Sequence, residues 1–360
     1  MLVSLCSKMV KPIIPIKTIQ TSKIRNRETN GDCFVMSKKN ENETNISYSE
    51  NDAIYKKNIC KATGIKKISP NALNSIVGPD EFKDIISKNS ERRNFYIAGE
   101  RPEKSAGISD SNDIENVKMK IFGANLHIHS NHSDGALSVE EILDQAVSYA
   151  NEYAKENDEK FVIGITDHNT SEGCKEAVKI IANNPEKYKN LKVVLGVEFS
   201  AKEDEINGYK LRKPEKYHIL AMSINPFETK LENFLQDLIS NSNNPMHPKA
   251  ITVQDVFENV KHQENCHFAL AHPAYPDITH RIYQDKDPYE TTQETMKHFK
   301  DIVGSRGLYA ECYYGGYSGK LATDEQLYKT IEKSCEQLGL YKAGGLDTHG
   351  ESIFYSGANA

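Results

Sequence analysis

Three absences narrow the kind of protein that this sequence can encode. It has no tryptophan, no CxxC pair and no apolar run that approaches the ~20 residues of a membrane span. The seven cysteines are scattered and odd in number, which fits free thiols in a reducing compartment better than a disulfide framework. The net charge of −6 gives no overall attraction to nucleic acid or to an anionic membrane, although it does not exclude a local basic patch. We therefore expect a cytoplasmic protein that has no membrane partner.

The first third of the chain differs in composition from the rest. Residues 1–27 contain Lys and Arg but no acid, and their apolar part is too short for a secretory signal, which leaves a transit-like segment as an alternative. Residues 28–58 are rich in Asn, Lys, Glu and Ser, and this composition predicts disorder or loose order. Residues 70–88 show two short helical patterns. We expect residues 1–115 to be a partly disordered extension of unknown function, and residues 116–360 to fold without it.

From residue 120 onward, apolar segments of strand length alternate with amphipathic helical patterns. Such alternation predicts a mainly parallel α/β sheet. Seven strands without an obvious break favour a closed or nearly closed barrel, in which an active site lies at the carboxyl ends of the strands. The expected strands lie near 119–128, 161–166, 192–199, 217–223, 267–271, 307–313 and 341–346. The expected helices start at the capping box Ser138–Glu141, at 172, near Leu231, at Thr252, at Thr292 and at the capping box of residues 323–326.

The most informative stretch is residues 125–135, which contains His127, His129, His132 and Asp134. Because His127 and His129 are two positions apart, a strand would direct both side chains to the same face. Two imidazoles on one face with a carboxylate shortly after them is ligand spacing for a transition metal. The alternative is a pair of polar residues on the solvated face of an edge strand. The metal interpretation gains from the rest of the chain, because candidate ligands recur at the ends of later strands: His168, Glu198, His272, Asp347 and His349.

His218 is an exception, because it stands at the start of its expected strand. No helix separates that strand from the one that ends at Glu198, only the polar segment 201–216. An antiparallel return of the chain would bring His218 back beside Glu198.

Six motifs carry a family resemblance. They are His-x-His-Ser-x-x-Ser-Asp-Gly at 127–135, Gly-Ile-Thr-Asp-His-Asn-Thr at 164–170, Gly-Val-Glu-Phe-Ser at 196–200, His-Ile-Leu-Ala at 218–221, Ala-His-Pro at 271–273 and Gly-Leu-Asp-Thr-His-Gly at 345–350. In this order they resemble the polymerase and histidinol phosphatase (PHP) superfamily. Within it, the chain is most similar to the small phosphoesterases that include nucleotide bisphosphate phosphatases and 5′–3′ exoribonucleases. The resemblance covers residues 120–350 and implies a distorted (β/α)7 barrel.

The resemblance also implies a site for up to three divalent metal ions, for which Zn, Mn and Fe are all candidates. The nine implied ligands fall into three sets: His127, His129, Glu198 and Asp347; Glu198, His218 and His272; and Asp134, His168 and His349. Glu198 would bridge the first two ions. Among the nine, we expect Glu198, Asp134 and His168 to be catalytic. Such ions would neutralise a phosphoryl group and lower the pKa of a bridging water, and the resulting hydroxide would attack phosphorus in line.

Further side chains are candidates for contact with a substrate. Arg281 could hold phosphate through its guanidinium fork, and backbone N–H groups of residues 315–319 around Ser318 could add to it, unless that Gly-rich stretch is an ordinary turn. His132 and His280 could protonate a leaving alcohol or be surface histidines. We therefore expect His280, Arg281 and Ser318 to bind substrate.

Two acidic residues and a group of tyrosines are each open to two interpretations. Asp167 either orients His168 or another ligand, or it caps a turn. Glu311 interrupts an apolar strand, and it either faces the barrel mouth or forms an ion pair. The tyrosines could stack on a base or pack in the core: Tyr313, Tyr314 and Tyr317.

The leading interpretation is a metal-dependent phosphoesterase that acts on a small phosphorylated metabolite or nucleotide. A 5′–3′ exonuclease on short RNA or DNA would use the same chemistry and would need a basic track, for which the candidates are Lys210, Arg212, Lys213 and Lys216. A histidinol-phosphate-type phosphatase is a third alternative. A metal-stabilised regulatory module without turnover ranks last, because all nine ligand positions are filled. The sequence makes no prediction of the oligomeric state.

Overall fold

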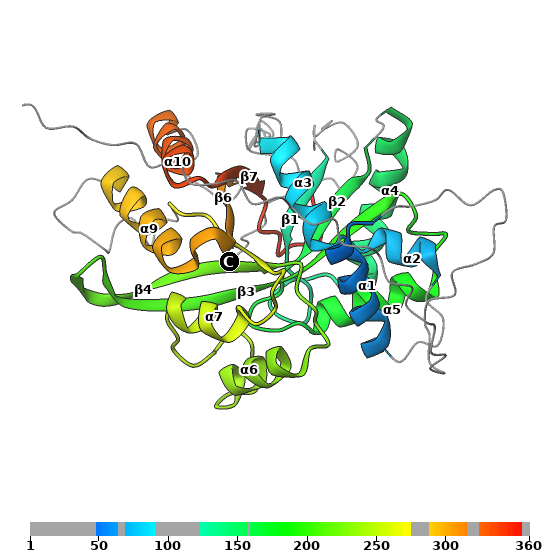
Figure 1. The fold of residues 1–360 in the computed structure, drawn as a ribbon, viewed down its shortest axis with the longest axis horizontal. Helices are drawn as coiled ribbons and strands as arrows, with labels where there is room; N and C mark the ends of the chain where they lie inside the picture. The colour runs from blue at the N-terminus through cyan, green and yellow to red at the C-terminus, as the bar shows by residue number, and fades with distance from the viewer. Residues whose placement is uncertain are drawn as a thin grey trace, which may run out of the picture.

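A computed structural model describes residues 48–63, 69–90, 123–156, 159–274, 288–314 and 324–354 of the chain. Seven strands form one sheet in sequence order, and the sheet curls into a nearly closed barrel (Figure 1). The strands are β1 (Ala124–Ile128), β2 (Phe161–Ile165), β3 (Leu191–Ile206), β4 (Tyr209–Met222), β5 (His267–Leu270), β6 (Gly307–Tyr314) and β7 (Tyr341–Gly345). All seven expected strands are confirmed, while residues 119–122 of the first lie outside the described residues.

The barrel closes between β1 and the segment that follows β7. The His129 N–H donates to the Thr348 carbonyl at 3.0 Å, and the Thr348 N–H donates to the His127 carbonyl at 3.2 Å. These two bonds bring the ends of the first and last strands together. Candidate ligands from opposite ends of the sequence therefore meet at one rim.

β4 is the one strand that runs against its neighbours, since it pairs antiparallel with both β3 and β5. β3 and β4 form a long hairpin that extends beyond the barrel (Figure 1). Its two-residue turn is Asn207-Gly208, where φ is 50° and 83°; two left-handed residues in a row suit Asn and Gly and match the twist of the strands. Ser200 pairs with His218. The predicted antiparallel return is confirmed, and the segment 201–216 is mostly strand.

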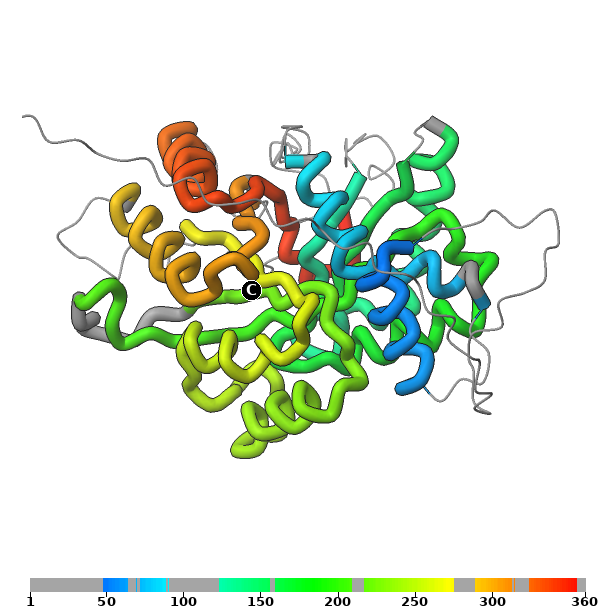
Figure 2. The backbone as a smooth tube through the Cα atoms, viewed as in Figure 1, coloured from blue at the N-terminus to red at the C-terminus, as the bar shows by residue number. Residues whose placement is uncertain are grey.

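The helices that cover the sheet follow the expected pattern closely. They are α4 (Val139–Glu156), α5 (Glu172–Asn183), α6 (Thr229–Ile239), α7 (Val253–Val260), α9 (Pro288–Val303) and α10 (Glu325–Leu338). The capping box before α4 is confirmed, because the Ser138 N–H donates to Glu141 at 2.8 Å and the Glu141 N–H donates to the Ser138 hydroxyl at 3.3 Å. In Figure 2, α9 and α10 lie side by side, and α6 and α7 form a second pair near the base of the hairpin.

Two expected helix starts were wrong. Thr292 lies buried inside α9, which already begins at Pro288. The N-cap of α10 is Asp324, whose carboxylate accepts the Leu327 N–H at 3.0 Å. In both cases, a Thr near the true start of the helix has a side chain that is typical of an N-cap residue.

Three helices precede the barrel: α1 (Glu50–Thr63), α2 (Pro70–Ser75) and α3 (Pro79–Ser90). The two helical patterns predicted within 70–88 are confirmed, but the prediction of disorder is wrong for residues 50–58. The Tyr55 hydroxyl donates to the Ile224 carbonyl at 2.8 Å, and the Val77 N–H donates to the Val193 carbonyl at 2.9 Å. The helices are thus tied directly to β3 and to the segment after β4. The boundary at residue 116 stays a prediction.

A polar network lies under these helices. Lys56 is almost fully buried, and its Nζ lies 3.5 Å from Glu81 Oε2. The Nζ of Lys192 on β3 lies 2.6 Å from Glu81 Oε1. Burial lowers the pKa of Lys56 to about 8 despite these carboxylate contacts. A single acidic side chain on α3 therefore joins α1 to the barrel.

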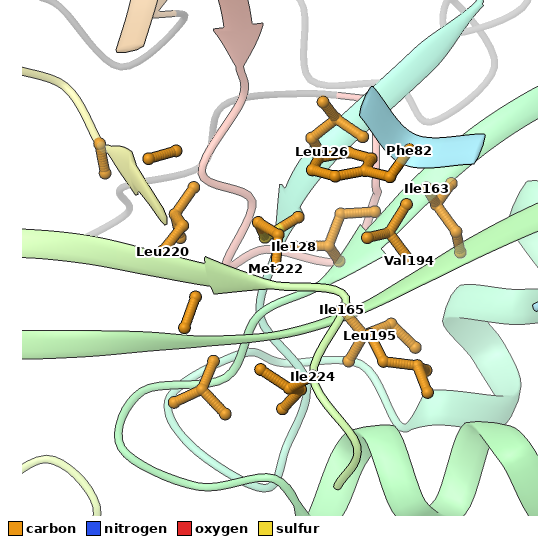
Figure 3. Close-up of a cluster of buried hydrophobic side chains, with 14 of the residues drawn as sticks. Phe82, Leu126, Ile128, Ile163, Ile165, Val194, Leu195, Leu220, Met222 and Ile224 are labelled. Atoms are coloured by element: carbon orange, nitrogen blue, oxygen red, sulfur yellow. The ribbon is translucent and has the colours of Figure 1, made fainter. Parts of the chain in front are cut away.

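The apolar core is one continuous cluster that includes the N-terminal helices. Figure 3 shows Phe82 of α3 beside Leu126 of β1 and Ile163 of β2. Tyr55, Ile59 and Ile86 belong to the same cluster. Among the described residues, no helix is long and apolar enough to cross a membrane.

Candidate metal centre

All nine candidate ligands lie at one rim of the barrel, and each has a ligand atom within 4.0 Å of another of the nine. We call these nine residues the ligand cluster. His127 and His129 come from the end of β1, and Glu198 and His218 come from the paired strands of the hairpin. The remaining members follow strands as loop residues: Asp134, His168, His272, Asp347 and His349.

Glu198 is the centre of the ligand cluster and is fully buried. Its Oε2 lies 2.9 Å from His127 Nε2, 3.0 Å from His129 Nε2 and 3.3 Å from His168 Nδ1. Its Oε1 lies 3.0 Å from His218 Nδ1 and 3.5 Å from His272 Nε2. Five imidazoles from four different segments therefore surround one carboxylate.

Several buried polar atoms in the ligand cluster form no hydrogen bond of good geometry with any described residue, although some of them lie within ion-pair distance of one another. They include Glu198 Oε1, His129 Nδ1 and His168 Nδ1. Buried nitrogen and oxygen atoms are nearly always satisfied in folded proteins. A carboxylate inside a ring of imidazoles with such atoms left over is a donor set that fits divalent transition metals. The residues present therefore fit the metals that the sequence predicts.

Three groups in the cluster have ligand atoms within 4.8 Å of one another: His129, Asp134, His168 and His349; His127, His129, Glu198 and Asp347; and His168, Glu198 and His218. The second group is the same as a predicted set. In the other two, His129 joins the set of Asp134, and His168 stands beside Glu198 and His218 where His272 was expected. His272 Nε2 stays near, 3.2 Å from His218 Nδ1. The role of each side chain as a ligand stays a prediction.

The charges of the cluster suit cation binding. Burial alone would raise the pKa values of Glu198 and Asp347, but the surrounding histidines, His127 first, hold both well below the ordinary range. For His129, burial opposes protonation, but hydrogen bonds to Asp347 and Glu198 raise its pKa to about 10. His168 differs, because burial lowers its pKa to about 3. Both carboxylates are thus ionised, as metal ligands must be.

Glu311 on β6 holds two candidate ligands from behind. Its Oε1 lies 2.9 Å from His127 Nδ1, and its Oε2 accepts the His272 backbone N–H at 3.0 Å. Because Glu311 takes Nδ1, the Nε2 of His127 faces the cluster. Gly345 makes room for this carboxylate, since a Cβ there would lie 1.9 Å from Glu311 Oε1. The two interpretations of Glu311 therefore combine: its carboxylate is directed into the barrel and forms an ion pair with His127 there.

Asp347 is held in the same way by Tyr314. The Tyr314 hydroxyl donates to Asp347 Oδ2 at 2.7 Å, while Oδ1 lies 3.0 Å from His129 Nε2. The backbone is strained at two cluster residues, because φ is 49° at Asp347 and 28° at His272. Non-glycine residues adopt positive φ rarely, and such strain tends to occur at functional sites.

Asp167 caps a turn and does not orient His168. Its Oδ1 accepts the Ser130 N–H at 2.7 Å and the Ser133 hydroxyl at 2.8 Å, and its Oδ2 accepts the Ser130 hydroxyl at 2.8 Å. These bonds fix the loop that carries Asp134. Asp167 therefore acts on the cluster through that loop.

Of the remaining candidates for substrate contact, His132 can be placed, and it lies outside the ligand cluster. His132 Nε2 lies 2.6 Å from Glu176 Oε2 in a partly exposed pair, which agrees with a surface histidine. The other predictions lie outside the residues or side chains that the structure describes: His280, Arg281, residues 315–319 with Ser318, Tyr317, and the side chains of Tyr313, Lys210, Arg212, Lys213 and Lys216.

A cavity that the sequence does not predict lies beside the ligand cluster. Its volume is about 330 Å³, and His168 and His218 of the ligand cluster are among its lining residues. The other lining residues are Ser200, Lys202, Met246, His247 and Pro248. The α6–α7 loop, residues 240–252, had shown no signal because its polar composition resembles that of any surface connection.

Comparison with known proteins assigns the chain to a family. The PHP domain family model matches residues 125–313, more than half of the chain, so the protein belongs to the PHP domain family. No curated protein matches the chain. One similar solved structure, provisionally named a metal-dependent phosphoesterase, comes from Bifidobacterium adolescentis. The two chains are 15% identical with a TM-score of 0.44, and the match covers 66% of this chain and 90% of that one. This similarity is too low to add to the assignment.

Proposed function

We propose that this PHP domain protein is a metal-dependent phosphoesterase that hydrolyses a phosphomonoester or phosphodiester of a small nucleotide or metabolite. The observation that carries the proposal is the position of Glu198, a fully buried carboxylate surrounded by five imidazole nitrogens at 2.9–3.5 Å. A purely structural carboxylate needs no such ring. Membership of the PHP domain family supports the same conclusion.

Each set of side chains has a distinct task in this proposal. Glu198 would help to hold two of the metal ions, and Asp134, His168 and His349 would hold a third. Up to three ions of zinc, manganese or iron, when bound, would neutralise the phosphoryl oxygens and activate a water for in-line attack. Glu311 and Tyr314 keep His127 and Asp347 in the orientation that binding requires. Glu198, Asp134 and His168 are the catalytic residues that we propose.

The test is an activity panel with the purified protein and added manganese, zinc or iron. It compares nucleoside monophosphates, nucleoside bisphosphates and short oligonucleotides. We expect metal-dependent release of phosphate or nucleotide that a chelator abolishes. Asp134→Asn should lose most of the activity. The matched control is Asp144→Asn, which removes a surface ion pair between Asp144 on α4 and Lys187 and should keep the activity. Absence of both bound metal and hydrolysis with all three metals would refute the proposal.

A further inference from the structure

We propose that the cavity beside the ligand cluster holds the leaving group of the substrate, and that Lys202 selects a small leaving group with an anionic substituent. The proposal rests on the proposed phosphoesterase function, because it takes the metal centre as the place where the phosphoryl group lies. It adds the chemical class of the part that leaves. Neither the family match nor the predicted ligand set assigns this cavity.

The position of the cavity suits a leaving group. His168 and His218, which line the cavity, each have a ring nitrogen within 3.3 Å of a Glu198 carboxylate oxygen. A phosphoryl group at the ligand cluster would therefore direct one of its substituents into this space. The lining also includes the apolar side chains of Met246 and Pro248, which suit a short carbon chain.

The cavity wall is fixed in place by its own hydrogen bonds. Asn169, which adopts a φ of 52°, donates from Nδ2 to the Pro245 carbonyl at 2.8 Å and accepts the Ser200 N–H at 3.1 Å. The Lys202 N–H donates to the Ile251 carbonyl. The α6–α7 loop is thus attached to β3 at two points, through Asn169 at Pro245 and directly at Ile251. Such preorganisation lowers the entropy lost when a ligand binds.

The polar groups in the cavity favour negative charge. Lys202 extends from the same strand as Glu198, four residues further along, so the two side chains leave the same face of the sheet. Lys202 lines the cavity and forms no ion pair with any residue that the structure describes. Ser200 adds a hydroxyl, and His247 adds a ring that can donate a hydrogen bond. The described lining residues include no carboxylate.

The size of the cavity favours a small metabolite over a polymer. Ligand pockets in proteins span roughly 300–1,000 Å³, and this cavity of about 330 Å³ lies at the low end of that range. An oligonucleotide would need a groove that continues along several nucleotides. A leaving group of a few carbons that ends in a carboxylate or a second phosphate fits the space and the charge.

The experiment compares three esters built on one three-carbon chain: 3-hydroxypropyl phosphate, 3-phosphonooxypropanoate and propane-1,3-diyl bisphosphate. The manganese-loaded full chain should show a kcat/KM about fivefold higher for the two charged esters than for the neutral one, the upper end of what a partly exposed ion pair contributes. Lys202→Met, which keeps the side-chain length, should bring the ratio close to one through KM. Lys249→Met, in the same loop but paired with Asp237, should leave the ratio unchanged.

Each outcome decides the proposal. Preference for only one charged ester would identify the substituent as carboxylate or phosphate. Equal kcat/KM for all three esters in the wild type, or an equal change with Lys249→Met, would overturn the role of Lys202. If none of the three is hydrolysed while the wider panel shows activity, the assignment of the cavity is wrong. If no phosphoester of any kind is hydrolysed, the proposed function fails. Calorimetry then tests the cavity by itself, and equal affinity of the wild type and Lys202→Met for the bisphosphate would refute the role of Lys202 in binding an anionic group.

Discussion

Glu198→Gln is the substitution that tests the metal centre most directly. Glutamine has nearly the shape of glutamate but no charge, and one oxygen is replaced by an amide nitrogen that cannot bind a metal. The Oε2 position faces three imidazoles and the Oε1 position faces two. We expect the amide nitrogen to take the Oε1 position, because fewer contacts are lost there. The metal on the side of His218 and His272 should then bind most weakly.

The size of the effect follows from the number of ligands that remain. Without Glu198, its group with His127, His129 and Asp347 keeps three ligands, and its group with His168 and His218 keeps two. Metal-assisted charge stabilisation contributes several kcal/mol to such reactions. We therefore expect kcat to fall by roughly 10³-fold or more, which corresponds to about 4 kcal/mol of transition-state stabilisation.

The assay is steady-state kinetics beside elemental analysis of the same purified samples. Bound metal should drop by about one ion per chain in Glu198→Gln, and circular dichroism should show that the fold survives. Glu176→Gln serves as the matched control, because Glu176 pairs with His132 outside the ligand cluster. Near-normal turnover of Glu198→Gln with a full metal complement would refute both the bridging role and the three-metal site.

Three further predictions follow from other contacts. Glu311→Gln should weaken metal binding by about 10–100-fold in a chelator competition, because His127 loses the carboxylate that orients its ring while all nine candidate ligands are retained. The melting temperature should change little, and unchanged metal affinity would contradict the positioning role. The pKa of Lys56 is lowered to about 8 in the folded chain, so the unfolded chain binds more protons than the folded chain above pH 8. The free energy of unfolding from urea titrations should therefore rise between pH 8 and 10 in the wild type relative to Lys56→Met; the same pH dependence in both proteins would exclude this linkage. Although the sequence favours a boundary at residue 116, a chain that starts at Asn116 should be insoluble or unfolded, because burial of Ile59, Phe82 and similar side chains contributes about 1.5–3 kcal/mol each. A well-folded, metal-binding product would instead support that boundary.

The positions of strands and helices could be predicted because they depend on local periodicity. The apolar patterns predict all seven strands, and the spacing of His127 and His129 predicts that their side chains share a face. Residues 50–58 were misjudged because α1 is polar along much of its length. Its order comes from tertiary contacts such as the Tyr55 hydrogen bond to Ile224, which joins residues 169 positions apart.

Contacts that depend on the closure of the barrel had no local signal. Glu311 was recognised as unusual in its strand, but its partner His127 lies 184 residues earlier. In the sequence, nothing distinguishes Tyr314 from tyrosines that pack in the core. The α6–α7 loop becomes a cavity wall only because Asn169 reaches Pro245 across 76 residues.

The β3–β4 hairpin has a consequence for how the protein can change over time. The inner pair Ser200–His218 sets the position of His218 relative to Glu198, whereas the turn at Asn207-Gly208 lies far from the ligand cluster. Between the pairs Glu203–Glu215 and Glu205–Lys210, one residue of β3 stands opposite four residues of β4. The outer hairpin therefore already accommodates extra chain without moving the inner pair. Insertions and deletions beyond Glu203 can alter the surface that extends from the barrel mouth while Glu198 and His218 keep their register. The hairpin therefore separates a part of the sequence that is free to diverge from the part that positions the ligand cluster.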